Sequence, residues 1–182
     1  MTLGVGQWFP VDIAVDSPRG PVSVADLLSD GPVVVTFHRL WCPFCQQAAR
    51  ELAAAETEIA GGGGRVAIVY REDVATVQRA SRERGTPFLC LSDTHRELET
   101  ATEIDQFTVG RYAAFSPRKL IAALGSGSRI AMPRSGILQG RGTFVVARGG
   151  SIVYAHHSTT AADIAPVSDV LEALRALSHR PT

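Results

Sequence analysis

The feature that most constrains the fold is the joint between the run "VVVTF" at residues 33–37 and the segment "HRLWCPFCQQ" that follows it. An unbroken apolar run rich in β-branched residues predicts a strand that is buried on both faces. Over residues 44–59 the apolar side chains recur at helical spacing, and four glycines at 61–64 end the pattern. The stretch therefore predicts a central strand leading directly into an amphipathic helix, with Cys42 and Cys45 at the turn between them.

The rest of the chain continues the alternation of strands and helices. It indicates a mixed sheet with helices on both faces, right-handed crossovers in its first half, and one domain over residues 1–182. The irregular stretch at 106–140, which holds one short helix in "SPRKLIAAL", is expected to cover a site or form an interface. Further strands are expected at 65–70, 88–91, 143–147 and 151–156, and further helices at 73–84, 95–103 and 164–177.

Charge and hydropathy restrict the partners. Lys plus Arg and Asp plus Glu both number 18, so the chain has no excess of positive charge with which to bind nucleic acid or an anionic membrane. Apolar runs are strand-sized, and "MTLGVGQWFPVD" lacks the basic start and apolar block of a signal peptide. We therefore expect a cytoplasmic protein, whose three cysteines are reactive, ligating or buried rather than a disulfide framework.

The cysteine pair has the position and spacing of a redox centre. The carboxyl end of such a strand lies at the edge of the sheet where α/β sites gather. Cys42 would precede the helix, with Pro43 in the first turn, where free N–H groups and the helix dipole favour a thiolate. Cys45 follows one turn later on the same face and can close a short disulfide with Cys42. This predicts Cys42 as the exposed nucleophile and Cys45 as its more buried partner.

Two other interpretations of the pair are weaker. A tetrahedral zinc site needs four ligands, of which a lone CxxC supplies half, and His156 and His157 would point to opposite faces of a strand. We therefore expect no metal. Two inert core cysteines would not be expected at a strand-to-helix turn among Trp, Pro and Phe, whereas Cys90 in "FLCL" is expected to be a buried apolar side chain.

Several segments taken together resemble a known family. "VVVTFHRLWCPFCQQAARELA" resembles the active-site strand and helix of peroxiredoxin-like proteins of the thioredoxin fold, in the alkyl hydroperoxide reductase C / thiol-specific antioxidant group and its peroxiredoxin-like 2 branch. "GQWFPVDIAVDSPRGPVSVADLL", "PFLCLSDTHREL", "GRGTFVVARGGSIVYAHHS" and "IAPVSDVLEAL" are similar to the family's later landmarks in the same order. The resemblance implies a thioredoxin-like fold with a peroxiredoxin-type N-terminal extension.

The resemblance also assigns roles at the site. Peroxiredoxins carry an arginine at the start of the strand beside the reactive cysteine, and Arg141 matches it, which implies a cation that stabilises the thiolate and orients a peroxide oxygen. The chain departs from the pattern twice. Gly142 precedes Thr143, where thioredoxins have a cis-proline, and Arg39 stands three residues before Cys42, where peroxiredoxins have Thr or Ser. The missing hydroxyl predicts slow peroxide reduction.

The expected substrate-binding residues are Arg39, Trp41, Pro43 and Thr143. Arg39 is interpreted either as a holder of an anionic group or the thiolate, or as a solvated loop arginine. Trp41 either walls the pocket or packs over the strand end, and packing is favoured.

The function predicted from these observations is thiol-dependent peroxide reduction without metal or organic cofactor. The Cys42 thiolate attacks a peroxide and becomes a sulfenic acid, Cys45 resolves it to a disulfide, and an external thiol, thioredoxin-like or of low molecular weight, reduces that disulfide. The alternatives are thiol–disulfide exchange, a dedicated redox step on a small metabolite, and a non-enzymatic redox-sensing module. The oligomeric state is left open, a homodimer included.

Overall fold

The central element is the strand predicted from "VVVTF". The computed structural model describes residues 3–104, 117–125, 127–128 and 140–179 of the chain. In it β3 (Val33–Phe37) has every side chain buried. Parallel to it on one side runs β4 (Arg65–Tyr70), and antiparallel on the other runs β6 (Gly142–Val146). The remaining strands are β1 (Ala14–Ser17), β2 (Gly20–Ser23), β5 (Leu89–Ser92) and β7 (Ile152–His157).

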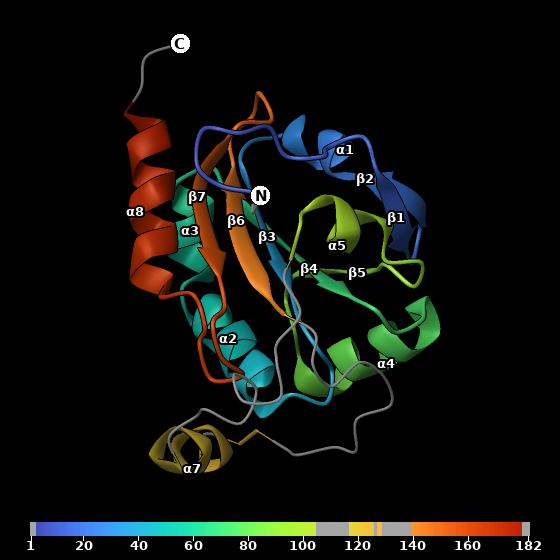
Figure 1. Cartoon of the computed structure of the whole chain (residues 1–182), viewed down its shortest axis with the longest axis vertical. Coiled ribbons are helices and arrows are strands. Elements are labelled where there is room, and N and C mark those ends of the chain that lie inside the picture. Colours follow the sequence, from blue (N-terminus) through green and yellow to red (C-terminus); the bar gives the residue numbers. More distant parts are fainter. Residues whose placement is uncertain (1–2, 105–116, 126, 129–139, 180–182) are drawn as a thin grey trace.

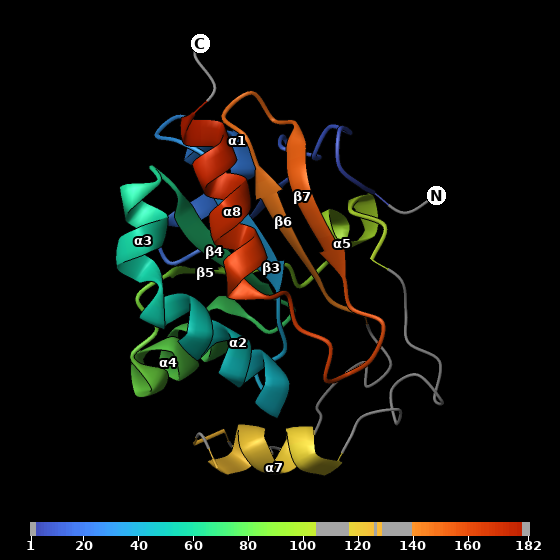
Figure 2. The ribbon, with the colours of Figure 1, turned by 90° about the vertical axis from the view of Figure 1, so that its left-hand side faces the viewer.

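These strands form one mixed sheet in the order β2-β1-β5-β4-β3-β6-β7. Helices cover both of its faces (Figures 1 and 2). One face carries α2 (Pro43–Ala54), α3 (Glu56–Gly61), α4 (Val74–Arg84) and α8 (Val167–Ser178), and the other carries α1 (Val24–Leu28) and α5 (Glu97–Ala101). The predicted α/β architecture is confirmed.

The period-two alternation of β3 builds both halves of the core. Val33, Val35 and Phe37 belong to the hydrophobic cluster under α1 and α5, whereas Val34 belongs to the cluster under α2, α3, α4 and α8. Because successive side chains of a strand point to opposite faces, an unbroken apolar run is what a sheet covered on both sides requires.

The boundaries expected for α4 hold to within one residue, whereas the helices expected at 95–103 and 164–177 form as Glu97–Ala101 and Val167–Ser178. Asp73 accepts the Thr76 N–H at 2.9 Å and so caps α4, and Gly85 ends the helix with a φ of 61°, which glycine adopts readily. The helix expected over residues 44–59 is divided, because Ala55, with φ −97° and ψ 8°, separates α2 from α3. The strand expected at 88–91 is displaced by one residue and forms β5.

The irregular segment predicted at 106–140 is described only in part. α7 (Pro117–Gly125) confirms the short helix expected there and lies against α2, as both views show (Figures 1 and 2). The rest of that prediction, apart from residues 127–128 and 140, falls outside the described residues. Among the helices that are described, none has the length and apolar character to cross a membrane.

Candidate active site around Cys42 and Cys45

The turn after β3 places both cysteines at the start of α2. Cys42 is the residue that precedes the helix, Pro43 is its first residue, and Cys45 follows one turn in, as predicted. Both are free thiols. Cys45 is 2% exposed and is the more buried of the two, but Cys42 is only 6% exposed, so the expectation of an exposed nucleophile is wrong.

The burial of Cys42 comes from segments distant in sequence. Trp41, Phe44 and the two cysteines share a buried cluster with Ala123 of α7 and with Ala161 and Ala162, which follow β7. Trp41 therefore packs over the pair. Ser128, just after α7, accepts a hydrogen bond from Arg50 at 2.6 Å and donates one to the Pro43 carbonyl at 2.9 Å, which ties this segment to α2.

Arg141, just before β6, is brought to both sulfurs. Its Nη1 lies 3.5 Å from Cys42 Sγ and 3.2 Å from Cys45 Sγ. Its Nη2 donates to the carbonyls of Thr160, Ala161 and Asp163. Because one edge of the guanidinium is fixed by backbone carbonyls, the other edge is held against the sulfurs, and the side chain is only 5% exposed.

Arg39 is also buried, at 3% exposure, so the interpretation as a solvated loop arginine is wrong. Its backbone N–H donates to Cys45 Sγ at 3.3 Å, and its Nη1 donates to the His38 carbonyl at 3.0 Å. Its Nη2 lies 3.5 Å from a carboxylate oxygen of Glu99. Burial lowers the pKa of Arg39 to about 10, which leaves the side chain cationic at neutral pH.

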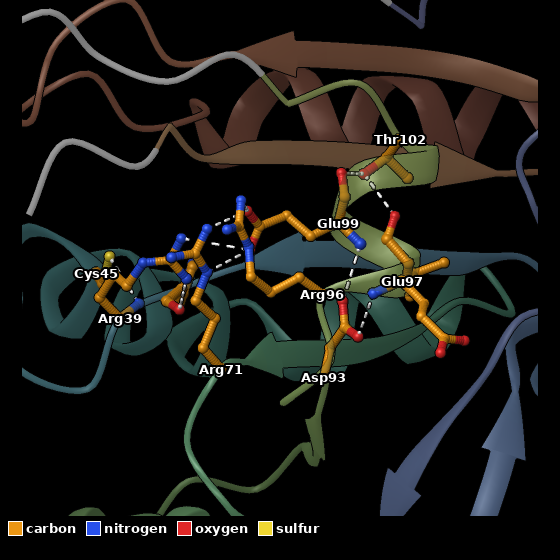
Figure 3. A network of polar contacts seen from close by, with 10 residues as sticks. Arg39, Cys45, Arg71, Asp93, Arg96, Glu97, Glu99 and Thr102 are labelled. Atoms are coloured by element: carbon orange, nitrogen blue, oxygen red, sulfur yellow. Dashed lines mark hydrogen bonds and ion pairs between the residues drawn. The ribbon is translucent and has the colours of Figure 1, made fainter. Parts of the chain in front are cut away.

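Glu99 of α5 holds this arginine within a wider network (Figure 3). Arg71 donates to its two carboxylate oxygens at 2.8 Å and 2.5 Å, and Arg96 lies 3.7 Å away. Asp93 fixes the start of α5 by accepting the backbone N–H groups of Glu97 and Glu99, each at 2.9 Å. Sequence reasoning missed Glu99 and Arg71, because neither belongs to a motif and only the folded chain places them next to Arg39.

Two further residues lie near the end of β3, His38 just after that strand and Thr143 on the neighbouring strand β6. The His38 ring is buried beside Tyr70, and burial together with the cations Arg141 and Arg39 lowers the pKa of His38 to about 4, so its ring is neutral at pH 7. The Thr143 hydroxyl shares a 2.8 Å hydrogen bond with the Thr36 hydroxyl across the two strands. Thr143 thus lies two residues from Arg141, but its hydroxyl is hydrogen-bonded to the neighbouring strand β3.

The two thiols ionise unequally. Burial alone would raise the pKa of Cys45, but a hydrogen bond from the Cys42 thiol and the positive charge of Arg141 hold that pKa well below its ordinary value. Cys42, which donates its proton toward Cys45 and is itself buried, has its pKa raised well above the ordinary value. In the folded chain the donors therefore favour a Cys45 thiolate, whereas the helix position alone had pointed to Cys42.

A cavity of about 350 Å³ opens beside the pair, and Cys45, but not Cys42, is among the residues that line it. In the described part of the chain no group of three His, Cys, Asp or Glu side chains is arranged to hold a metal ion. His156 pairs with Asp163 at 3.1 Å and His157 with the Leu3 carbonyl at 2.6 Å, each on its own side of β7.

Comparison with known proteins identifies the family and the fold. Residues 5–155 match the AhpC/TSA family. The peroxidoxin BcpB of Mycobacterium tuberculosis superposes with a TM-score of 0.72 at 20% identity, over 96% of this chain and 98% of that one. Peroxiredoxin Q of Xanthomonas campestris gives a TM-score of 0.69 at 17% identity, over 96% and 98%.

A putative thiol:disulfide interchange protein DsbE of Chlorobium tepidum gives a TM-score of 0.65 at 16% identity, over 95% of this chain and 99% of that one. A sequence comparison with curated proteins gave no match. The solved structures confirm the predicted thioredoxin-like fold of the peroxiredoxin type.

Proposed function

The chain belongs to the AhpC/TSA family and is a thiol-dependent oxidoreductase, and from that premise we propose that it reduces peroxides through the Cys42–Cys45 pair. The observation that carries the proposal is the position of Arg141, whose Nη1 lies 3.2 Å and 3.5 Å from the two sulfurs. A fixed cation at this distance stabilises a thiolate and can donate to the oxygen on which negative charge develops.

We assign the attack to Cys45 and the resolving step to Cys42, which reverses the roles expected from the helix position. Cys45 Sγ accepts the Arg39 N–H at 3.3 Å and is the closer of the two sulfurs to Arg141. Of the two cysteines, Cys45 is also the one that lines the cavity through which a peroxide can arrive. Both the charge and the access thus favour Cys45.

The reaction then has two steps. The Cys45 thiolate attacks the terminal peroxide oxygen, an S–O bond forms, the O–O bond breaks, and the departing alkoxide or hydroxide takes up a proton. The Cys42 sulfur next attacks the Cys45 sulfenic acid, its own proton leaves with the hydroxyl as water, and the Cys42–Cys45 disulfide remains. An external thiol restores the dithiol.

The expectation of slow turnover is kept under this assignment. Peroxiredoxins place a Thr or Ser hydroxyl three residues before the reactive cysteine, and three residues before Cys45 stands Cys42. The resolving thiol occupies the place of the hydroxyl, so Arg141 remains the main donor toward the peroxide.

The segment around α7 is part of this proposal. We propose that the region 106–140 covers the site, and the packing of Ala123 against the cysteine cluster and the hydrogen bonds of Ser128 support that role. Excluding water around the pair would strengthen the interactions of the thiolate with Arg141.

Serine variants of each cysteine test the proposal. The reduced protein is mixed with hydrogen peroxide or an organic hydroperoxide in a stopped-flow instrument, and sulfenic acid is trapped with dimedone and mapped by mass spectrometry. We expect Cys45→Ser to abolish the reaction, Cys42→Ser to accumulate sulfenic acid on Cys45, and the control Cys90→Ser to behave as wild type.

The contrary outcomes are equally distinct. Dimedone labelling of Cys42 in Cys45→Ser, with an inert Cys42→Ser variant, would restore the order predicted from the sequence. A wild-type protein that reduces insulin disulfides rapidly without consuming either peroxide would establish disulfide exchange as the function instead.

A further inference from the structure

The cavity beside Cys45 has the size and the charge of a binding site for a small anion. Its volume of about 350 Å³ lies within the range of about 300–1,000 Å³ typical of small-molecule sites. Among the described residues that line it, Arg39, Arg50 and Arg84 are opposed by a single carboxylate, Glu83. The wall is therefore cationic next to the reactive sulfur.

Arg39 is the most buried of these cations and is incompletely paired. Its Nε makes no hydrogen bond within the described part of the chain. Glu99, its ion-pair partner among the described residues, is shared with Arg71 and Arg96, so three guanidinium groups surround one carboxylate. Buried donors without partners are costly, and the planar fork of a guanidinium matches a carboxylate. The site is suited to a ligand that carries carboxylate groups.

The burial of the cysteine pair favours a small thiol over a protein thiol as its reductant. Cys42 and Cys45 are only 6% and 2% exposed, so the surface cysteine of a protein reductant could not approach their sulfurs without displacing the covering segments. A small thiol can reach Cys45 through the cavity. Attack on Cys45 makes Cys42 the leaving group, and the Arg141 guanidinium, 3.5 Å from its sulfur, stabilises the thiolate that forms.

We propose that this cavity binds a carboxylate-bearing low-molecular-weight thiol, which reduces the Cys42–Cys45 disulfide through a mixed disulfide on Cys45. The inference rests on the proposed function, because it names the electron donor for the same cysteine pair. The incoming thiolate attacks Cys45 Sγ, the S–S bond breaks, and Cys42 leaves with the electron pair. A second molecule of the thiol then attacks the outer sulfur, which releases the Cys45 thiolate and a symmetric small-molecule disulfide.

The test compares thiols that share a two-methylene spacer and differ in the charge of the polar group. Protein oxidised with diamide is reduced in single turnover by 3-mercaptopropionate, 2-mercaptoethanol or 2-aminoethanethiol, each rate being corrected to its thiolate concentration. Loss of the disulfide is followed by intact mass after alkylation. We expect the carboxylate thiol to react about threefold to tenfold faster than the neutral one, and the cationic thiol to be slowest.

Matched variants on α4 locate the effect. Arg84→Gln, in the cavity wall, should remove most of the advantage of 3-mercaptopropionate over 2-mercaptoethanol. Arg82→Gln removes the same charge from an exposed position of the same helix that does not line the cavity, and should keep the advantage. In Cys42→Ser, incubation with the symmetric disulfide of 3-mercaptopropionate should leave the adduct on Cys45.

Equal corrected rates for the three thiols, or faster reduction by micromolar thioredoxin than by millimolar 3-mercaptopropionate, would overturn the proposal. The measurement starts from chemically oxidised protein and does not depend on peroxide. Carboxylate selectivity in a protein that consumes no peroxide would therefore support the cavity while removing the peroxidase function.

Discussion

Replacing Arg141 by Met is the perturbation that probes the site most directly. Met keeps most of the length of the side chain and removes both the charge and the fork that faces Cys42 and Cys45. The pKa of the Cys45 thiol should rise, because one of the influences that hold it down is this cation. The pH at which the reduced protein begins to react with iodoacetamide should move upward accordingly.

The size of the rate effect can be bounded from the geometry. Unit charges 3.2 Å apart interact by about 5 kcal/mol at an effective dielectric constant of about 20 and by about 1 kcal/mol in water. At about 1.4 kcal/mol per factor of ten, this range corresponds to a loss between roughly fivefold and a few thousandfold. Removal of one preorganised donor commonly slows a reaction by about 10²–10³, which lies inside that range, and we expect the peroxide rate to fall by this amount.

The assay is stopped-flow oxidation by hydrogen peroxide at several pH values, with the alkylation profile measured in parallel. Arg148→Met, at an exposed position of the turn after β6, removes the same charge far from the sulfurs and serves as the control. Arg141→Lys keeps a charge but cannot bridge sulfurs and carbonyls with one fork, so it should be intermediate.

Stability must be measured too, since Met leaves the carbonyls of Thr160, Ala161 and Asp163 without their Arg141 donor. A variant that unfolds more easily but keeps the wild-type alkylation profile and peroxide rate would refute the reasoning. Arg141 would then be a structural clamp for the loop after β7, and the peroxidase assignment would lose the observation that carries it.

Two further predictions concern buried groups around the pair. Because the pKa of His38 falls from 6.5 to about 4 on folding, the unfolded chain binds more protons between these values. Stability should therefore decrease by about 3 kcal/mol as the pH falls through this window, and urea unfolding should show a smaller decrease for His38→Gln. Glu99→Gln leaves the buried Arg39 and the partly buried Arg71 without their counter-charge, and it should cost about 3–5 kcal/mol in the same assay. Glu97→Gln, at an exposed position of the same helix, should cost little, and equal losses would refute the role of the network.

The local sequence pattern was sufficient to predict the strand and helix that hold the cysteines. The apolar run at residues 33–37, Pro43 at the helix start, and Asp73 and Gly85 at the ends of α4 are each set by neighbours along the chain. Strand alternation, helix capping and glycine backbone freedom act over a few residues, so they can be seen before folding.

The family resemblance also predicted the position of Arg141 beside the reactive cysteine. The guanidinium lies 3.5 Å from Cys42 Sγ, although the two residues are 99 positions apart in the sequence. No local pattern contains that contact. The resemblance predicted this contact because matching several segments to a known fold also implies which strands are neighbours in the sheet.

The burial of Arg39 and the distribution of charge between the thiols were decided by tertiary structure alone. Arg39 can be buried only because Glu99, from α5, lies opposite it. Cys42 stands at the favourable helix position, yet the Arg39 N–H and the closer approach of Arg141 belong to Cys45. Sequence determines which groups can ionise. Which of them does so depends on burial and on charges a few ångströms away, and those distances exist only in the folded chain.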